Sequence, residues 1–395
     1  RTHLTKSLIK HNKQSNTMSS NNNSRDNQIA EDVPQYRSVM ISGPLSAPPL
    51  PRSFASMRPA KAAPQITQQA KPTISEAPIW QVAELPSMPA AYFLEKTNVY
   101  VDGNAQDVAD RICDHLRVVS IAAQCGEDDK NLLVAETCDA VRFAVRLFND
   151  QGKVVVEVQR KCGCSYQFRE AAKSVLRSAK GVKASPPKRK FTIPSSIPRE
   201  SPEDQQQRAE DGFKVAMNQL TSNLMESQLI GMESLEQLTT CECRCSASKN
   251  VFGDECIEKV LSAAQSDVSD ARTEIEERHS TMMKRRALTV LANALCALSE
   301  SSQLEDMLQG CSHLTCNSFI SCLVDTLGQS SDCPHEATQA ARCMQKLMIA
   351  NEVKDHLMEL SAITIVSSAC SSGACRSAFL EAEAKKLHEH LSSCV

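Results

Sequence analysis

Long hydrophobic runs are absent from this sequence of 395 residues. No run of 18 apolar residues occurs, so we predict no membrane-spanning helix. Aromatic residues are scarce too, at 4% of the chain, which leaves few rings for stacking on nucleic-acid bases. The sequence also lacks a G-x-S-x-G nucleophile elbow, a G-x-x-x-x-G-K-S/T phosphate loop and an H-E-x-x-H zinc motif. We therefore expect a protein that is not an enzyme and needs no cofactor.

Cysteine, by contrast, is abundant, with 18 residues. The opening stretch RTHLTKSLIKHNKQSN is basic and polar and contains no recognisable secretory signal. We therefore expect reduced thiols and a cytoplasmic protein, with a nuclear or peripheral-membrane location as the alternatives. Met18 is a candidate start residue, and the basic run at 187–190 is a candidate nuclear import signal.

The strongest metal candidate is the cluster Cys241, Cys243, Cys245 and Cys256. Zinc prefers four ligands in a tetrahedron, and three thiolates in a C-x-C-x-C run strain such a chelate around one ion. We therefore favour a loop between helices with partly buried thiols, and keep metal binding as the alternative. Cys311, Cys316, Cys322, Cys333 and His335 fall at helical positions, which favours core packing.

Four regions follow one another along the chain. Residues 1–88 are rich in Asn, Ser and Gln and then in Pro and Ala, and we predict that they are disordered. Trp80, the only tryptophan, either belongs to this tail or docks on the domain that follows. Residues 182–204 form a basic linker rich in Pro and Ser.

Residues 90–181 predict a small α+β domain. A strand at 98–101 and a helix at 105–116 precede four strand-like runs at 118–123, 131–136, 141–148 and 153–159, and a helix at 168–179 closes the unit. Each helix carries an apolar stripe on one face, and Asn149–Gly152 is the clearest turn between strands. Alternating polar and apolar residues in 141–148 indicate an antiparallel sheet with one core face.

Residues 205–395 predict helices throughout. Among the expected helices are 205–227, 229–240, 268–280 and 282–299, with a loop between 240 and 253. In the repeat-like segment 213–240 we also expect a turn near Gly231. Short helices with small-residue cores favour an all-α solenoid that resembles armadillo or HEAT repeats, with an irregular bundle as the alternative. The charged stretch from Glu274 to Arg286 reads as a solvent-exposed helix face.

The sequence KCGC at 161–164 is the most conspicuous short motif. It lacks the C-x-x-C spacing of a redox pair and supplies at most two metal ligands. Gly163 can adopt positive φ, and Cys164 or Ser165 can open a helix as a short polar residue. We therefore predict a turn from strand to helix, with a metal or redox site as the alternative.

Basic residues dominate the segment 153–190, where 11 lysines and arginines face only Glu157 and Glu170. Within it, four cations share one helical face at spacings of i, i+4, i+8 and i+11. This pattern predicts an anion-binding site, with acidic phospholipid favoured and nucleic acid less so. The candidate residues are Arg160, Lys161, Arg169, Lys173, Arg177 and Lys180.

The segment 154–179 resembles the end of the kinase-associated C-terminal domain of AMP-activated and microtubule-affinity-regulating kinases. Val156, Val158, Arg160, Gly163 and Phe168 match its strand, turn and aromatic helix start, although Cys164 replaces its usual small polar or acidic residue. The resemblance covers about 90–181 and implies a βαββββα fold that docks on anionic phospholipid or a protein. No kinase motifs accompany it.

These observations together predict a non-enzymatic adaptor or scaffold. The kinase-associated-type domain would dock on acidic phospholipid or a protein partner, and the helical repeats would bind another protein. The alternative is a nucleic-acid-binding protein that uses segment 153–190, or a metal-dependent protein that uses the clustered cysteines.

Overall fold

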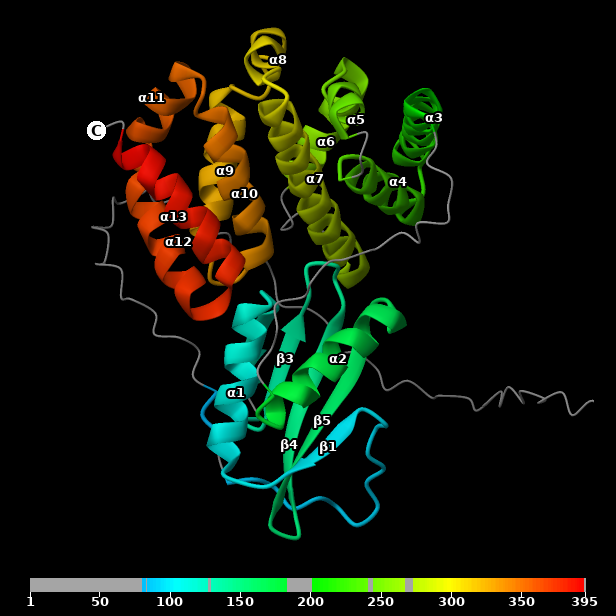
Figure 1. Ribbon diagram of the computed structural model, residues 1–395, viewed down its shortest axis with the longest axis vertical. Coiled ribbons are helices and arrows are strands. Elements are labelled where there is room, and N and C mark those ends of the chain that lie inside the picture. Colours follow the sequence, from blue (N-terminus) through cyan, green and yellow to red (C-terminus); the bar gives the residue numbers. More distant parts are fainter. Residues whose placement is uncertain are drawn as a thin grey trace, which may run out of the picture. The chain divides into compact units, whose positions relative to one another are not determined.

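The structure is a computed structural model that describes residues 80–82, 84–126, 129–182, 201–240, 244–266 and 273–393. These residues belong to one compact unit, with an α+β part up to residue 182 and a helical part from residue 201 (Figure 1). Residues 1–79 of the expected tail and residues 183–200 of the expected linker, including the basic run at 187–190, lie outside the described residues.

The α+β part contains the predicted antiparallel sheet of five strands. The strands are β1 (Asn98–Val101), β2 (Ala122–Cys125), β3 (Leu132–Glu136), β4 (Arg142–Asp150) and β5 (Lys153–Cys162), in the spatial order β1-β5-β4-β3-β2. The strand expected at 118–123 was misplaced. Val118 still belongs to helix α1 (Ala105–Val118), and Ser120 at φ 56° turns the chain before β2 begins.

Helices α1 and α2 (Ser165–Ala179) cover one face of this sheet (Figure 1). The apolar stripes that the sequence predicted for both helices are buried with the inward side chains of β4 and β5 in one core. The β4–β5 hairpin turns through Gln151 and Gly152 at φ 52° and 82°, the left-handed pair that a tight two-residue turn requires.

The KCGC motif forms the predicted turn from strand to helix. β5 ends at Cys162, and Cys164 is the N-cap of α2, although its side chain makes no capping hydrogen bond. Gly163 has φ 92°, and a Cβ there would lie 2.7 Å from Cα of Val141. Glycine is therefore required both by the backbone conformation and by the approach of the neighbouring chain.

The opposite face of the sheet is partly covered by the segment before β1. Tyr92 packs on Phe148 with ring centroids 5.2 Å apart, and its hydroxyl donates to Glu157 Oε2 at 2.6 Å. The backbone N–H of Glu95 donates to Glu157 Oε1 at 2.7 Å. Glu157 is fully buried, and these bonds satisfy a carboxylate that would otherwise oppose folding.

Trp80 also packs against the α+β core, so ordered structure begins before the expected boundary at residue 90. Its side chain is 1% exposed, and Nε1 donates to the carbonyl oxygen of Lys130 at 2.8 Å. An indole buried with its N–H satisfied in this way anchors the chain to the domain.

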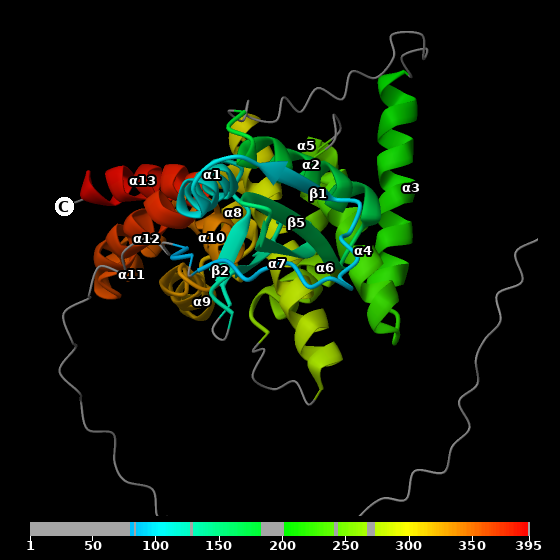
Figure 2. The ribbon, with the colours of Figure 1, turned by 90° about the horizontal axis from the view of Figure 1, so that it is seen from below.

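The rest of the described chain is helical. The helices are α3 (Pro202–Leu220), α4 (Met225–Leu238), α5 (Arg244–Val251), α6 (Asp254–Ala264), α7 (Glu274–Glu300), α8 (Leu304–Gly310), α9 (Asn317–Gly328), α10 (Pro334–Leu347), α11 (Asn351–Glu359), α12 (Ala362–Arg376) and α13 (Ala378–Ser392). Helix α7 packs against α4, α5, α6 and α10, and α12 packs against α13. In Figure 2, α3 and α13 lie on opposite sides of the array with α7 between them.

Three boundaries in this region were predicted wrongly. A break was expected at residue 281, but α7 continues through it, and the Thr281 hydroxyl donates to the carbonyl oxygen of Glu277 in the preceding turn. A turn was expected near Gly231, but this residue lies within α4, where a Cβ would be 2.7 Å from Ala216 O. The loop expected between 240 and 253 contains helix α5.

No single helix in the described ranges is long and apolar enough to cross a membrane. Helices α11 and α12 reach the required length and apolarity only as a pair, and they are bent by 80° relative to each other.

Candidate anion-binding site

Helix α2 presents the four predicted cations on its exposed face. Arg169, Lys173, Arg177 and Lys180 are all exposed, whereas Ala172, Val175 and Ala179 on the other side of the helix are buried in the core. The helical period therefore separates a packed stripe from a basic one, as the sequence predicted.

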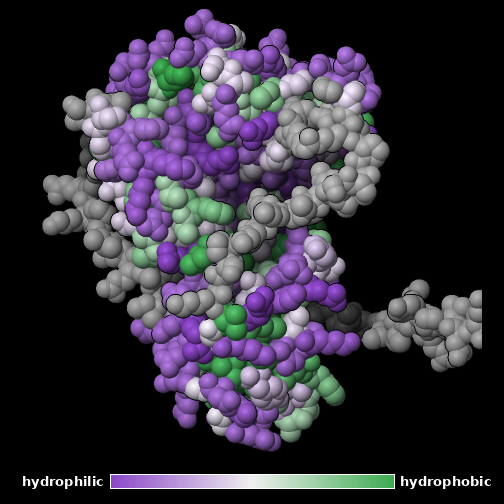
Figure 3. Space-filling model, viewed as in Figure 1, coloured by the Kyte–Doolittle hydropathy of each residue, from purple (hydrophilic) through white to green (hydrophobic). Residues whose placement is uncertain are grey.

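The four cations line a shallow groove of about 350 Å³ between α2 and the start of β1. Leu176 contributes from α2, and residues 96–99 contribute from the β1 side, including Lys96 and Val99. Figure 3 shows hydrophilic side chains running across this part of the molecule, with hydrophobic surface between them. We call the nine lining residues the basic groove: Lys96, Thr97, Asn98, Val99, Arg169, Lys173, Leu176, Arg177 and Lys180.

The charge of the basic groove is of one sign. Five of its nine lining residues are cationic, and none is acidic. The ion pairs found among the described residues include none of these five side chains. Glu157, an acidic residue of the adjacent strand, is buried and hydrogen-bonded to Tyr92 and Glu95. A groove of this kind can bind an anion through several charge-assisted hydrogen bonds.

Lys96 was missed in the sequence analysis because it lies outside the counted segment 153–190. The pairing of β1 with β5, with Asn98 opposite Glu157, brings the start of β1 beside α2. The signal in the sequence was weak. Only a correct pairing of the first strand with the last would have added this lysine to the site.

Two predicted residues lie outside the groove lining. Arg160 Nη1 donates to the carbonyl oxygen of Gly163 at 3.0 Å, which braces the KCGC turn. Lys161 falls at an irregularity in the β4–β5 register, where Phe143 pairs with Arg160 and Arg142 pairs with Cys162. Both side chains are exposed, but the groove is built from α2 and β1 without them.

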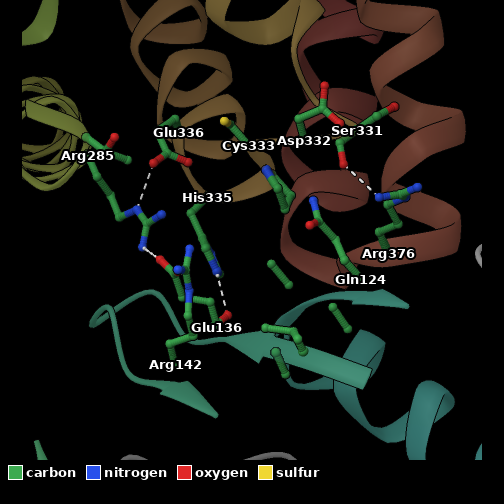
Figure 4. A pocket seen from close by; sticks show the side chains of 16 residues that line it. Gln124, Glu136, Arg142, Arg285, Ser331, Asp332, Cys333, His335, Glu336 and Arg376 are labelled. Atoms are coloured by element: carbon green, nitrogen blue, oxygen red, sulfur yellow. Dashed lines mark hydrogen bonds and ion pairs between the residues drawn. The ribbon is translucent and has the colours of Figure 1, made fainter. Parts of the chain in front are cut away.

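A second polar cluster joins the sheet to the helical part (Figure 4). Arg285 of α7 donates from Nε to Glu336 Oε1 at 2.8 Å and from Nη1 to Glu136 Oε1 at 2.7 Å. His335 Nε2 lies 3.1 Å from the carbonyl oxygen of Glu136 and donates to it, because a carbonyl oxygen can only accept. Arg142 also pairs with Glu136, at 3.2 Å.

Burial and charge oppose each other in this cluster. Burial would raise the pKa of Glu136, but Arg285 and Arg142 outweigh it and hold that pKa below its ordinary value. Burial and then the charge of Arg285 lower the pKa of His335. The cluster is therefore a set of ion pairs and a neutral imidazole that hold two parts of the chain together, rather than a free acid or base.

This cluster corrects the expectation of a solvent-exposed face at the end of the stretch 274–286, whereas Glu274 and Glu277 near its start are exposed as expected. The Arg285 and Arg286 side chains are 12% and 15% exposed, and Arg286 pairs with Glu236 of α4 at 2.7 Å. His335 is buried as expected, but it makes a specific polar contact as well as packing. Sequence spacing could not reveal this because the partners lie between 50 and 199 residues apart.

The two described members of the cysteine cluster lie in different helices. Cys245 lies in α5, and its thiol contacts the carbonyl oxygen of Ala297, whereas Cys256 is buried in α6. Burial raises the pKa of Cys256 to about 12, which favours an unreactive thiol. Cys241 and Cys243 lie outside the described residues. No group of three or more potential metal ligands occurs within the described ranges.

Comparison with known proteins gives no relative for this chain. No family model matches it, and no curated protein or solved structure matches it.

Proposed function

We propose that the protein is a non-enzymatic adaptor whose α+β part docks on acidic phospholipid through the basic groove. The observation that carries the proposal is the convergence of five cations from two elements on a groove lined by no acidic residue. Each basic residue near an acidic membrane surface contributes about 1 kcal/mol, so five of them suffice for reversible binding.

The order of elements supports the proposed likeness to the kinase-associated C-terminal domain. The α+β part follows the order β1-α1-β2-β3-β4-β5-α2, which is the βαββββα arrangement that this resemblance implies. Phe168, the aromatic residue of the matching motif, packs on Phe143 with ring centroids 6.3 Å apart. This packing of Phe168 supports the proposed likeness.

The helical part would then serve as the second arm of the adaptor. We propose an armadillo-like array that binds a protein partner. Successive helices pack in pairs, such as α3 with α4 and α12 with α13, which is the construction that stacked repeats use. Docking at one end and protein binding at the other would bring the partner to a membrane surface.

Co-sedimentation of the full chain with vesicles tests the docking proposal. We expect binding to vesicles of phosphatidylcholine with phosphatidylserine, little binding to phosphatidylcholine alone, and weaker binding as salt rises. Replacing Arg169, Lys173, Arg177 and Lys180 with Glu should abolish it. A single Lys173→Ala change should weaken it about fivefold, the equivalent of about 1 kcal/mol.

The matched control reverses four exposed cations outside the groove. Lys130, Lys249, Lys259 and Arg278 are exposed and do not line it, so their replacement by Glu makes the same change in net charge. This control should still bind acidic vesicles. Equal loss in both variants would mean that total charge, rather than the groove, drives binding. Retention of the wild-type chain on RNA without vesicle binding would favour the nucleic-acid alternative.

A further inference from the structure

The basic groove runs along an open edge of the sheet. Strand β1 comes last in the spatial order of the strands, and among the described residues it pairs only with β5. Residues 96–99, which line the groove, belong to this strand and to the segment that leads into it. One wall of the groove is therefore an edge strand that has no second strand beside it in the described chain.

The register of β1 shows which backbone groups face this open edge. The N–H of Val158 donates to the carbonyl oxygen of Thr97 at 2.8 Å, and the next residue, Asn98, lies opposite Glu157. In an antiparallel pair, residues that exchange hydrogen bonds alternate with residues that do not. The N–H and C=O groups of Asn98 and Tyr100 therefore face away from β5, where an added strand could bind them.

Helix α2 forms the other wall of the groove. It packs against β1 and β5, whereas α1 packs against β2, so α2 lies on the β1 side of the sheet. Figures 1 and 2 both show α2 running alongside β1. The helical wall from Arg169 to Lys180 is about 16 Å long, which about five residues of an extended chain would match. Extended peptides that add to an open sheet edge bind with their backbone along the edge strand and their side chains in the adjoining pockets.

The charge of the groove specifies the occupant. Five lining residues are cationic and none is acidic. Side chains of a strand alternate between its two faces, so those that meet α2 come from every second residue. Carboxylates at these positions would pair with the lysines and arginines. A second copy of this chain does not fit, because pairing β1 with β1 would bring two basic grooves together.

We propose that the basic groove receives an extended peptide of a partner protein, with acidic residues at alternate positions, which adds to β1 as a further strand. The same cations would then serve the peptide and acidic phospholipid, so the peptide displaces the lipid. Strand addition stands without the proposed docking function, whereas the displacement rests on it. A partner that carries such a segment would release the protein from a membrane.

Fluorescence anisotropy of a labelled peptide tests strand addition on the full chain. The probe has about six residues, with glutamate alternating with valine. Two variants of the probe carry N-methyl groups, one on the glutamates and one on the valines, so that they have the same charge but each can pair through a different edge. We expect one variant to bind like the parent and the other about tenfold more weakly, because it loses its backbone hydrogen bonds to β1. Equal affinity of the two variants would overturn strand addition, because charge alone cannot distinguish them.

A substitution in β1 provides a second test. Asn98→Pro removes an N–H from the open edge, where proline is tolerated, and keeps all five cations. It should weaken binding of the parent peptide about tenfold and leave binding to acidic vesicles unchanged. Asn98→Ala is the matched control: it keeps the N–H and should bind the peptide like the wild type. Unchanged peptide binding by Asn98→Pro would contradict pairing with β1.

Displacement links the peptide to the docking function. Excess parent peptide should release the wild-type chain from vesicles of phosphatidylcholine with phosphatidylserine, and the weaker methylated variant should release much less. Binding of both peptide and vesicles without displacement would overturn the shared site. Absence of peptide binding would overturn the inference and leave the docking function standing. Absence of vesicle binding would overturn the docking function and the displacement, and strand addition would stand if the two methylated variants differ.

Discussion

Replacing Arg285 with methionine should destabilise the protein strongly. The change keeps most of the side-chain volume but removes the cation that joins Glu136 to Glu336. The Glu336 side chain is 4% exposed and would lose the cation that it pairs with, whereas Glu136 would still pair with Arg142. Removing one member of a buried ion pair costs about 3–5 kcal/mol. Because Glu136 keeps its pair with Arg142, we expect Arg285→Met to lower the free energy of unfolding by about 3 kcal/mol.

A compensating substitution separates the unpaired charge from lost packing. Adding Glu336→Gln to Arg285→Met removes the buried charge, so the double variant should recover to within about 1 kcal/mol of the wild type. Urea denaturation followed by circular dichroism would measure the free energy of unfolding, and the denaturant slope would show whether the transition stays cooperative. A cost below about 1 kcal/mol for Arg285→Met, or no recovery in the double variant, would refute the proposed energetic role of this cluster.

Two further predictions concern the KCGC turn and the buried histidines. Gly163→Ala should cost about 2 kcal/mol or more in thermal or urea unfolding, because positive φ and the contact with Val141 act together. Gly152→Ala is the matched control: it has positive φ but open space around its Cβ, so a cost equal to that of Gly163→Ala would contradict the steric part. Burial lowers the pKa of His115 and of His335 below the ordinary 6.5, so stability should be fully present above pH 6.5 and fall as pH drops toward the lower native values. Replacing both histidines with Gln should flatten this part of the pH profile, and an unchanged profile would contradict the assignment.

Local patterns in the sequence were sufficient to predict most of the α+β part. Alternating strands, the turn at Asn149–Gly152 and the amphipathic stripe of α2 each depend on neighbouring residues, and each appears in the structure close to its expected position. Charge on one helical face was predictable for the same reason: Arg169, Lys173 and Arg177 are close in sequence and need only a helix to align them.

The errors arose where tertiary contacts override local signals. Gly231 was taken as a turn residue, but it is glycine because α3 passes too close for a side chain. Arg285 looked solvent-exposed by composition, but its partners come from a strand and a helix far away in the sequence. Lys96 joined the groove only through strand pairing. Contacts between residues far apart in the chain produce no regular pattern of residue types that a single sequence could reveal.

The uninterrupted length of α7 makes this helix a continuous stiff element through the helical part. At 27 residues it spans about 40 Å, and it contacts α4, α5, α6 and α10 along this length. Arg285 on the same helix binds Glu136 of the sheet. A force applied to the α+β part would therefore act on one continuous helix and reach several other helices at once. Such a load would tilt the array as a body instead of deforming its helices one after another.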